Sequence, residues 1–282
     1  MNYFQVATKN LNINHKKSKK LQITAIVVTF NEEKRLDFCL QSLSFCNQII
    51  VYDMGSTDNS LVISKKHTNF IKTISKVNII EKIYPQIIRD SLYDWIILCD
   101  PDEILPNSII DELEVIINEK PRIGLIHIPL QFYFLGKPLY STIWGQKKFK
   151  SKTFHKKRVC IGENVHDGIS LIDNYESHQI EWLEKNAISH YWVDSIPDLI
   201  KKHWRYIKYE GKAQYEREQR ISIRKFFGSP IRSLFDNLFK YDGIKDGYRG
   251  IFLSFFYFWY VVMGNFSLIL YQISLIKKQL VK

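Results

Sequence analysis

Cysteine is scarce in this sequence, with four residues in 282 and no two of them in a CxxC arrangement. This excludes a disulfide-stapled scaffold and favours reduced, buried thiols, which are typical of the cytosol. The four residues are Cys39, Cys46, Cys99 and Cys160. The stretch Met1–Val6 also lacks the apolar core of a signal peptide, so no secretory leader is expected. Internal repeats and low-complexity linkers are absent as well.

Acidic residues are outnumbered by basic ones. Forty Lys and Arg against 29 Asp and Glu give a formal net charge of +11 and a pI near 9.3. Such a surplus suits an anionic partner, which can be a nucleic acid, a phosphorylated substrate or an acidic membrane surface. The sequence has no helix-turn-helix, zinc-finger or RNA-binding signature, so we expect no nucleic-acid partner.

Apolar, strand-like segments alternate with helix-like segments through the first 120 residues. The strands are expected at residues 23–30, 48–52 and 95–99. This alternation predicts an α/β fold with a mostly parallel sheet and crossover helices, and ligands bind such sheets beyond the carboxyl ends of the strands. At its carboxyl end, each of the three strands is followed by polar residues, namely Asn31-Glu32, Asp53 and Asp100–Asp102.

The third strand is followed by the acidic stretch Asp100-Pro101-Asp102-Glu103. In an extended segment, residues i and i+2 point the same way, and Pro101 favours an extended backbone, so Asp100 and Asp102 are expected to project together. Two carboxylates on one side suit Mg²⁺ or Mn²⁺ that also binds substrate phosphates. The alternative is that Asp100 and Glu103 are turn or capping residues. The convergence of three polar strand ends on one edge favours the ligand site.

Three motifs resemble glycosyltransferase family 2, which has the GT-A fold. They are Thr29-Phe-Asn-Glu-Glu33, Val51-Tyr-Asp-Met-Gly-Ser-Thr-Asp58 and Asp94-Trp-Ile-Ile-Leu-Cys-Asp-Pro-Asp-Glu103. The resemblance covers residues 23–110 well. It continues more loosely through Trp144-Gly145, Val165-His166-Asp167-Gly168, Ser189-His190-Tyr191 and Tyr241-Asp242-Gly243. The longer pattern looks most like the bacterial branch that builds the lipopolysaccharide core and related cell-surface glycans.

This resemblance implies a nucleotide-sugar donor, most simply a UDP-sugar, with GDP as the alternative nucleotide. The residues implied in donor binding are Thr29, Asn31, Glu32, Asp53, Arg89 and Asp100. Arg89 would reach the diphosphate, and Asp100 and Asp102 would bind a Mg²⁺ or Mn²⁺ ion bridging the phosphates, whose Lewis acidity helps the nucleoside diphosphate to depart.

On the acceptor side, the resemblance points to Asp167 as the base that deprotonates the acceptor hydroxyl. The bacterial branch often has V-H-E where this chain has Val165-His166-Asp167, and the shorter side chain keeps the chemistry. His166 is either a metal ligand, a group that orients Asp167, or a structural histidine, and His190 is open in the same way. Trp144 either stacks on an acceptor sugar or is a core tryptophan.

Near the C-terminus, Ile251–Ile276 contains no charged residue and is long enough to span a bilayer. Basic residues flank it on both sides, which argues against crossing. We therefore expect a re-entrant or interfacial helical hairpin hinged near Gly264-Asn265, which docks on anionic lipid together with the basic helix Phe226–Lys240. A buried helix, a dimer interface and a spanning helix are the alternatives.

These observations predict a metal-dependent, inverting glycosyltransferase that acts on a lipid-linked or cell-surface glycan at the cytoplasmic face of the inner membrane. The expected organisation is a basic lead-in (1–20), a GT-A catalytic domain (21–195, with a nucleotide-sugar half 21–122 and an acceptor half 123–195) and a helical, membrane-associating region (196–282). Two alternatives are a catalytically inactive membrane-associated nucleotide-sugar-binding module and a nucleotidyltransferase. The latter is disfavoured by the absence of a Gly-rich phosphate loop after the first strand.

Overall fold

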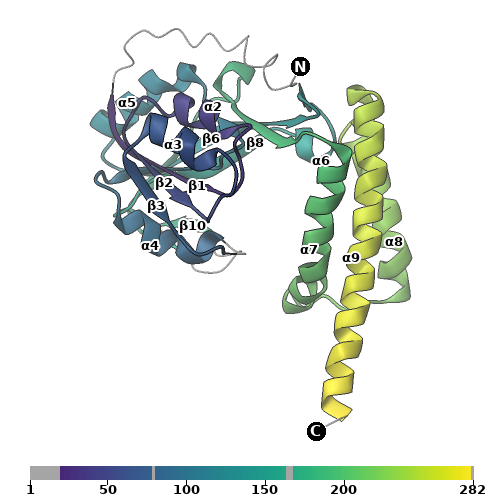
Figure 1. The fold of residues 1–282 in the computed structure, drawn as a ribbon. Helices are drawn as coiled ribbons and strands as arrows, with labels where there is room; N and C mark the ends of the chain where they lie inside the picture. The colour runs from purple at the N-terminus through teal and green to yellow at the C-terminus, as the bar shows by residue number, and fades with distance from the viewer. Residues whose placement is uncertain (1–19, 78–79, 163–167, 281–282) are drawn as a thin grey trace. The chain divides into compact units, whose positions relative to one another are not determined.

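The computed structural model describes residues 20–77, 80–162 and 168–280 (Figure 1). The chain divides into two compact units. The first unit contains the described residues up to Gln131 together with Lys147–Trp192. The second unit, called the helical unit below, contains Phe132–Gln146 and Val193 onward.

The first unit is built on a mixed sheet, in which the first four strands along the chain are parallel. The strand order is β3-β2-β1-β4-β8-β6-β12-β5, with β7 and β11 also pairing with β6. β1, β2, β3 and β4 are mutually parallel neighbours, and β8 joins β4 in the antiparallel direction. The strands are β1 (Leu21–Thr29), β2 (Cys46–Asp53), β3 (Phe70–Thr73), β4 (Trp95–Cys99), β5 (Glu103–Ile104), β6 (Ile123–Phe134), β8 (Lys148–His155), β11 (Glu176–Gln179) and β12 (Ile188–Val193). β7 (Lys137–Pro138) belongs to the helical unit and pairs there with the last residues of β6. A separate pair is formed by β9 (Val159–Ile161) and β10 (Ile169–Leu171).

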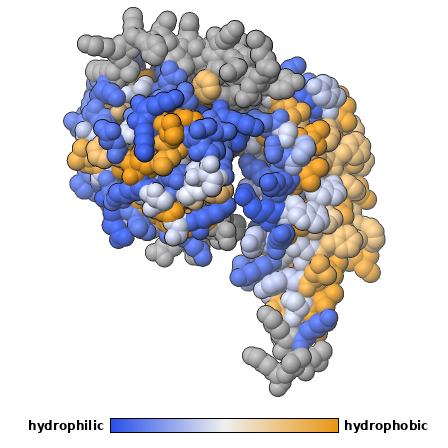
Figure 2. Space-filling view, in the orientation of Figure 1, coloured by the Kyte–Doolittle hydropathy of each residue, from blue (hydrophilic) through white to orange (hydrophobic). Residues whose placement is uncertain are grey.

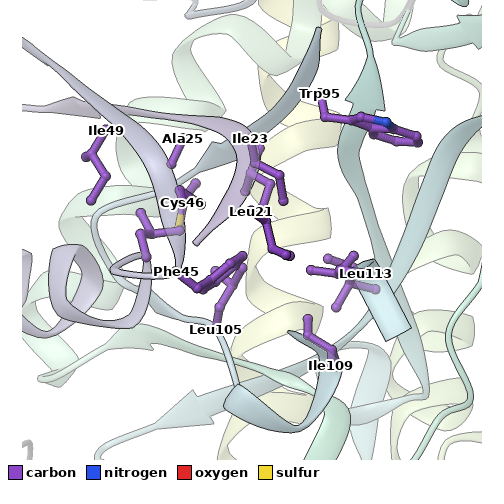
Figure 3. Close-up of a cluster of buried hydrophobic side chains, with 14 of the residues drawn as sticks. Leu21, Ile23, Ala25, Phe45, Cys46, Ile49, Trp95, Leu105, Ile109 and Leu113 are labelled. Carbon is purple, nitrogen blue, oxygen red and sulfur yellow. The ribbon is translucent and has the colours of Figure 1, made fainter. Parts of the chain in front are cut away.

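Helices cover both faces of this sheet, which explains why β1 is apolar along almost its whole length. Ile23, Ala25 and Val27 of β1 pack into one hydrophobic cluster, part of which Figure 3 shows, whereas Ile26 packs into another on the opposite face. The first cluster includes residues of α2 and α5, and the second includes residues of α4. The helices of this unit are α2 (Leu36–Ser42), α3 (Ser60–His67), α4 (Tyr84–Arg89) and α5 (Ile110–Glu119). Short 3₁₀ turns lie at Ile80–Ile83, Asn107–Ile109 and Glu184–Asn186. The α/β, GT-A-like fold expected from the sequence is confirmed.

The helical unit contains three long helices and a short one. These are α6 (Thr142–Gly145), α7 (Ile196–Glu216), α8 (Ile223–Phe235) and α9 (Tyr248–Leu280). A π-helical turn at Asp236–Lys240 and a 3₁₀ turn at Gly243–Asp246 connect α8 to α9. Both α7 and α8 pack along α9.

The helical hairpin expected near Gly264-Asn265 is wrong, because α9 runs through both residues without a break. Both have packing roles instead. The buried Asn265 amide donates to Ser229 Oγ at 3.0 Å and to the Phe226 carbonyl at 3.3 Å, which ties α9 to α8. A Cβ at Gly264 would lie 3.2–3.3 Å from side chains of α7, so the missing side chain permits close approach of the two helices.

α9 is also the one helix, within the described part of the chain, that is long and apolar enough to cross a membrane. The segment that meets this criterion is Tyr248–Lys277, and a third of its most apolar window is buried inside the protein. Its length and composition are compatible with a membrane-associated segment.

Candidate active site

The carboxyl ends of β1, β2 and β4 meet at one edge of the sheet in the first unit. Thr29, the last residue of β1, lies directly opposite Asp53, the last residue of β2. On the other side of β1, β4 ends at Cys99, and Asp100 follows at once. Parallel pairing therefore gathers the three polar strand ends that the sequence singled out, at the edge where α/β sheets bind ligands.

Two buried polar atoms at this edge have no hydrogen-bond partner in the described part of the chain. They are Thr29 Oγ1 and Asp53 Oδ1. The other carboxylate oxygen of Asp53 accepts hydrogen bonds from the N–H groups of Gly55 (3.1 Å) and Ser56 (3.0 Å), so the side chain is held in a fixed orientation. A buried polar atom without a partner costs about 1–3 kcal/mol, which a bound polar ligand can recover.

A cavity of about 150 Å³ lies beside these strand ends. Its wall comes from β1, β4, α4 and the residues next to them, namely Ile26, Val28, Met54, Ile80, Tyr84, Ile87, Leu98, Cys99 and Asp100. Val28 and Met54 are the chain neighbours of Thr29 and Asp53. Pockets for whole ligands are usually roughly 300–1,000 Å³, so this cavity is of a size to take one part of a nucleotide, such as its base.

Asn31 and Glu32 tie the loops after β1 and β2 together. The Asn31 side-chain oxygen accepts the Thr57 N–H at 2.8 Å. Glu32 pairs with Arg35 at 2.9 Å, and Arg35 in turn donates to the carbonyl of Tyr191 at 2.8 Å. Neither Asn31 nor Glu32 lines the cavity. Their contacts shape the edge of the site.

Asp100 and Asp102 do not project together from an extended segment as expected. Residues 100–103 form a turn, closed by the Glu103 N–H donating to the Asp100 carbonyl at 3.0 Å. The Asp100 carboxylate faces Lys150 at 3.1 Å and Lys152 at 3.8 Å, both on β8. The Asp102 carboxylate instead faces Nε2 of His190 on β12, at 3.3 Å. Pro101 fits into the turn because its fixed φ is also that of a turn residue.

Lys150 and Lys152 are the site residues that sequence reasoning missed. Burial alone lowers the pKa of both lysines, but the nearby Asp100 carboxylate, joined by Glu103 at Lys150, outweighs it and raises both pKa values above the usual range. The same lysines hold the pKa of Asp100 below its usual range against the effect of burial, whereas burial raises the pKa of Glu103. The alternating lysines of Lys148-Phe-Lys-Ser-Lys152, in a strand-like segment, were the signal available.

Asp100 and Asp102 are the carboxylates of this edge that could hold a divalent ion. They are close enough for their charges to interact, and the Asp102 carboxylate, paired with Nε2 of His190, raises the pKa of that histidine against the effect of burial. In the part of the chain that the structure describes, no group of three or more Asp, Glu, His or Cys side chains is arranged to hold an ion. Mg²⁺ is commonly held by one or two carboxylates plus substrate phosphates, so a bound diphosphate would have to complete the coordination of an ion at these two carboxylates.

The remaining predicted residues lie elsewhere. Arg89 is exposed at the end of α4 and does not line the cavity. Trp144 belongs to the helical unit, where it is buried with its ring in edge-on contact with His203 and Tyr257, and this packing favours the core-tryptophan alternative. His166 and Asp167 lie outside the described residues.

Comparison with known proteins gives one family match, over part of the chain. Residues 24–158 match the model of a family described as glycosyl transferase family 2. No curated protein sequence matches the chain.

Solved structures show weaker similarities. TarS residues 1–349 from S. aureus are 20% identical with a TM-score of 0.36, covering 40% of this chain and 36% of that one. The same TarS fragment in complex with UDP is 21% identical with a TM-score of 0.34, with the same coverage. The Mycobacterium tuberculosis glucosyl-3-phosphoglycerate synthase in complex with Mn²⁺ and UDP-glucose is 16% identical with a TM-score of 0.32, covering 45% of each chain. This chain thus spans less than half the length of each, and similarity at this level supports no assignment.

Proposed function

We propose, from the match of residues 24–158 to glycosyl transferase family 2, that the protein is an inverting, metal-dependent glycosyltransferase whose donor is a UDP-sugar. The single observation that carries the proposal furthest is the pair of buried, unpartnered atoms Thr29 Oγ1 and Asp53 Oδ1 at the carboxyl edge of the sheet. A carboxylate oxygen there can accept a hydrogen bond from an N–H group of a base such as uracil.

The chemistry of transfer requires three tasks. A divalent ion held by Asp100 and Asp102 would supply Lewis acidity to the diphosphate leaving group. Asp167 takes the proton of the acceptor hydroxyl. The hydroxyl oxygen then attacks the anomeric carbon from the side opposite the departing phosphate oxygen, and this single displacement inverts the configuration.

The acceptor we propose is a lipid-linked or cell-surface glycan, such as lipopolysaccharide core, reached at the cytoplasmic face of the inner membrane. The helical unit supports a membrane location. Exposed apolar side chains recur at every fourth position along α8 and the following π-helical turn, namely Ile223, Phe227, Ile231, Phe235 and Phe239. Exposed basic residues accompany this apolar stripe, namely Arg224, Arg232 and Lys240. Figure 2 shows hydrophobic residues gathered along the helical unit. An amphipathic helix of this kind lies in the plane of an anionic membrane surface.

The test is release of nucleoside diphosphate from a set of UDP-sugars and GDP-mannose, with Mn²⁺ present and envelope glycolipid as acceptor. We expect acceptor-dependent release with one UDP-sugar. We also expect it to fall by at least about 100-fold in Asp167→Asn, in line with the contribution of a general base. The matched control is Asp37→Asn, which changes a half-exposed carboxylate paired with His67 on the surface. Equal release by the wild type and Asp167→Asn would contradict the assigned base, and no release from any donor would contradict the proposed reaction.

A further inference from the structure

We propose that Lys152 of β8 binds the diphosphate of the donor, and that Lys150 is a positioning residue that fixes the carboxylates around it. The inference rests on the proposed transferase function and adds to it a cationic group on this chain that faces the leaving group from the β8 side.

Lys152 lies where it can reach a ligand in the cavity. Its Nζ is 3.8 Å from Asp100 Oδ2 and 5.6 Å from the centre of the Tyr84 ring, and both of these residues line the cavity. The Lys152 side chain is 29% exposed, so it is partly open to solvent.

Lys150 has a different environment. Its side chain is only 8% exposed, and its Nζ is committed to two carboxylates, Glu103 Oε2 and Asp100 Oδ2. Glu103 is itself 2% exposed and accepts the Asp100 N–H at 3.0 Å. The Lys150–Glu103 pair therefore stabilises the turn that carries Asp100, and the buried ammonium of Lys150 is already paired with both carboxylates.

A β-bulge lies in β8 at the two lysines. The pairing of β6 with β8 shifts register between Ile126–Thr153 and Ile128–Lys150, so the extra residue lies in β8 between Lys150 and Thr153. Bulges of this kind re-aim side chains and recur next to active sites. Here the bulge coincides with two lysines that approach the same oxygen of Asp100.

The charge balance explains why a lysine is needed at this position. Three carboxylates, those of Asp100, Asp102 and Glu103, crowd one side of the site and repel a diphosphate. As the bond between the anomeric carbon and the phosphate oxygen breaks, its electron pair stays on that oxygen, and the proton of the acceptor hydroxyl goes to Asp167. The ammonium of Lys152 stabilises the negative charge that develops on the diphosphate.

Calorimetric titration of UDP and of uridine separates the phosphate contact from the base contact. In Lys152→Met we expect UDP affinity to fall about 10- to 100-fold while uridine affinity stays unchanged, because a charge-assisted hydrogen bond to phosphate is lost. Lys152→Arg should recover most of the affinity. The matched control, Lys157→Met, removes a 70% exposed lysine paired with Asp94 just beyond the end of β8 and should change neither value.

Each other outcome overturns the inference. If the wild type binds UDP and Lys152→Met binds it equally well, the phosphate contact is refuted and the proposed function stands. If uridine affinity falls as much as UDP affinity, Lys152 supports the structure of the site and does not contact the diphosphate. If the wild type binds neither UDP nor GDP, the proposed function fails and this inference fails with it. In Lys150→Met we expect UDP affinity to fall while uridine affinity stays unchanged, and an unchanged UDP affinity would refute its positioning role.

Discussion

At the scale of the residue, Asp53 has two carboxylate oxygens with separate tasks. One oxygen holds the turn through Gly55 and Ser56, and the other is buried without a partner in the described residues. In Asp53→Asn the amide oxygen can still hold the turn, but the free position becomes an N–H donor. We expect uridine affinity to fall at least about 10-fold with little change in thermal stability, because hydrogen bonds to charged groups contribute roughly 1.5–3 kcal/mol.

Calorimetry with uridine measures the effect of Asp53→Asn, with Asp37→Asn as the matched surface control. Unchanged uridine affinity in Asp53→Asn would contradict base recognition by this carboxylate. A large loss of thermal stability would instead show that the Asp53 side chain stabilises the folded structure.

His155, at the end of β8, makes stability depend on pH. Burial, aided by the positive charge of Arg158, lowers its pKa from 6.5 to about 4. The unfolded chain then binds more protons than the folded chain between these two values, so the stabilisation is complete above pH 6.5 and is lost as the pH falls toward 4. A shift of this size corresponds to about 3 kcal/mol.

We therefore expect the wild type to lose about 2–3 kcal/mol more than His155→Gln between pH 7 and pH 4.5. Guanidinium unfolding of both proteins at the two pH values measures this difference. An equal loss in both would show that other groups control the acid response.

The residues of the site differ in how readily the sequence reveals them. Thr29, Asp53 and Asp100 are predictable, because each ends an apolar strand and parallel pairing must gather such ends. Lys152 and His190 approach the acidic turn from β8 and β12, about 50 and 90 positions farther along the chain. The alternating lysines of residues 148–152 are visible in the sequence, but the approach of β8 and β12 to the acidic turn depends on strand order, which leaves no local pattern.

At the scale of the element, the packing of α7 on α9 depends on a glycine. A Cβ at Gly211 would lie 2.2 Å from the Ser267 carbonyl oxygen, and the Gly211 N–H donates to Ser267 Oγ at 3.0 Å. Gly211→Ala should therefore force the two helices apart and lower the free energy of unfolding by about 2 kcal/mol or more.

Gly228 in α8 is the matched control, since no atom lies within 4 Å of a Cβ built there. Gly228→Ala should raise stability by about 0.5–1 kcal/mol through helix propensity alone. Guanidinium unfolding measures both variants. Similar effects of the two substitutions would contradict the close α7–α9 contact.

The predicted hinge in α9 shows why an element can be misread from its sequence. Gly and Asn side by side in an apolar run often mark a break. Here the Asn265 amide donates a hydrogen bond to α8, and the missing side chain of Gly264 lets α7 approach. Both residues therefore serve tertiary contacts, and the helix continues through them. The neighbouring helices that make these contacts lie about 40 to 50 residues away and are invisible to a local pattern.

At the scale of the whole molecule, the charge of +11 and the apolar stripe on α8 together predict binding to anionic membranes. Phe227 and Phe235 are 62% and 58% exposed, so replacing both with Ser should leave the fold intact. We expect the double variant to bind phosphatidylglycerol vesicles at least about 10-fold more weakly, since each buried aromatic ring contributes up to roughly 1.5–3 kcal/mol.

Co-sedimentation with phosphatidylglycerol vesicles, and with neutral phosphatidylcholine vesicles, measures this binding. The control replaces Val62 and Val115, two exposed apolar residues of the first unit, with Ser. Binding that is equal for the two lipids, or unaffected by the Phe substitutions, would contradict the membrane surface. A concentration-dependent dimer that the Phe substitutions abolish would assign the stripe to a second copy of the chain.

The central claim is that a nucleoside diphosphate and a divalent ion meet at the carboxyl edge of β1, β2 and β4. Calorimetric titration of UDP into the wild type and into Asp102→Ala, with and without Mn²⁺, tests it most directly. The account predicts tight UDP binding that requires Mn²⁺ in the wild type and is lost in Asp102→Ala, while Asp37→Ala binds like the wild type. Failure of the wild type to bind UDP or GDP, with or without Mn²⁺, would contradict the claim.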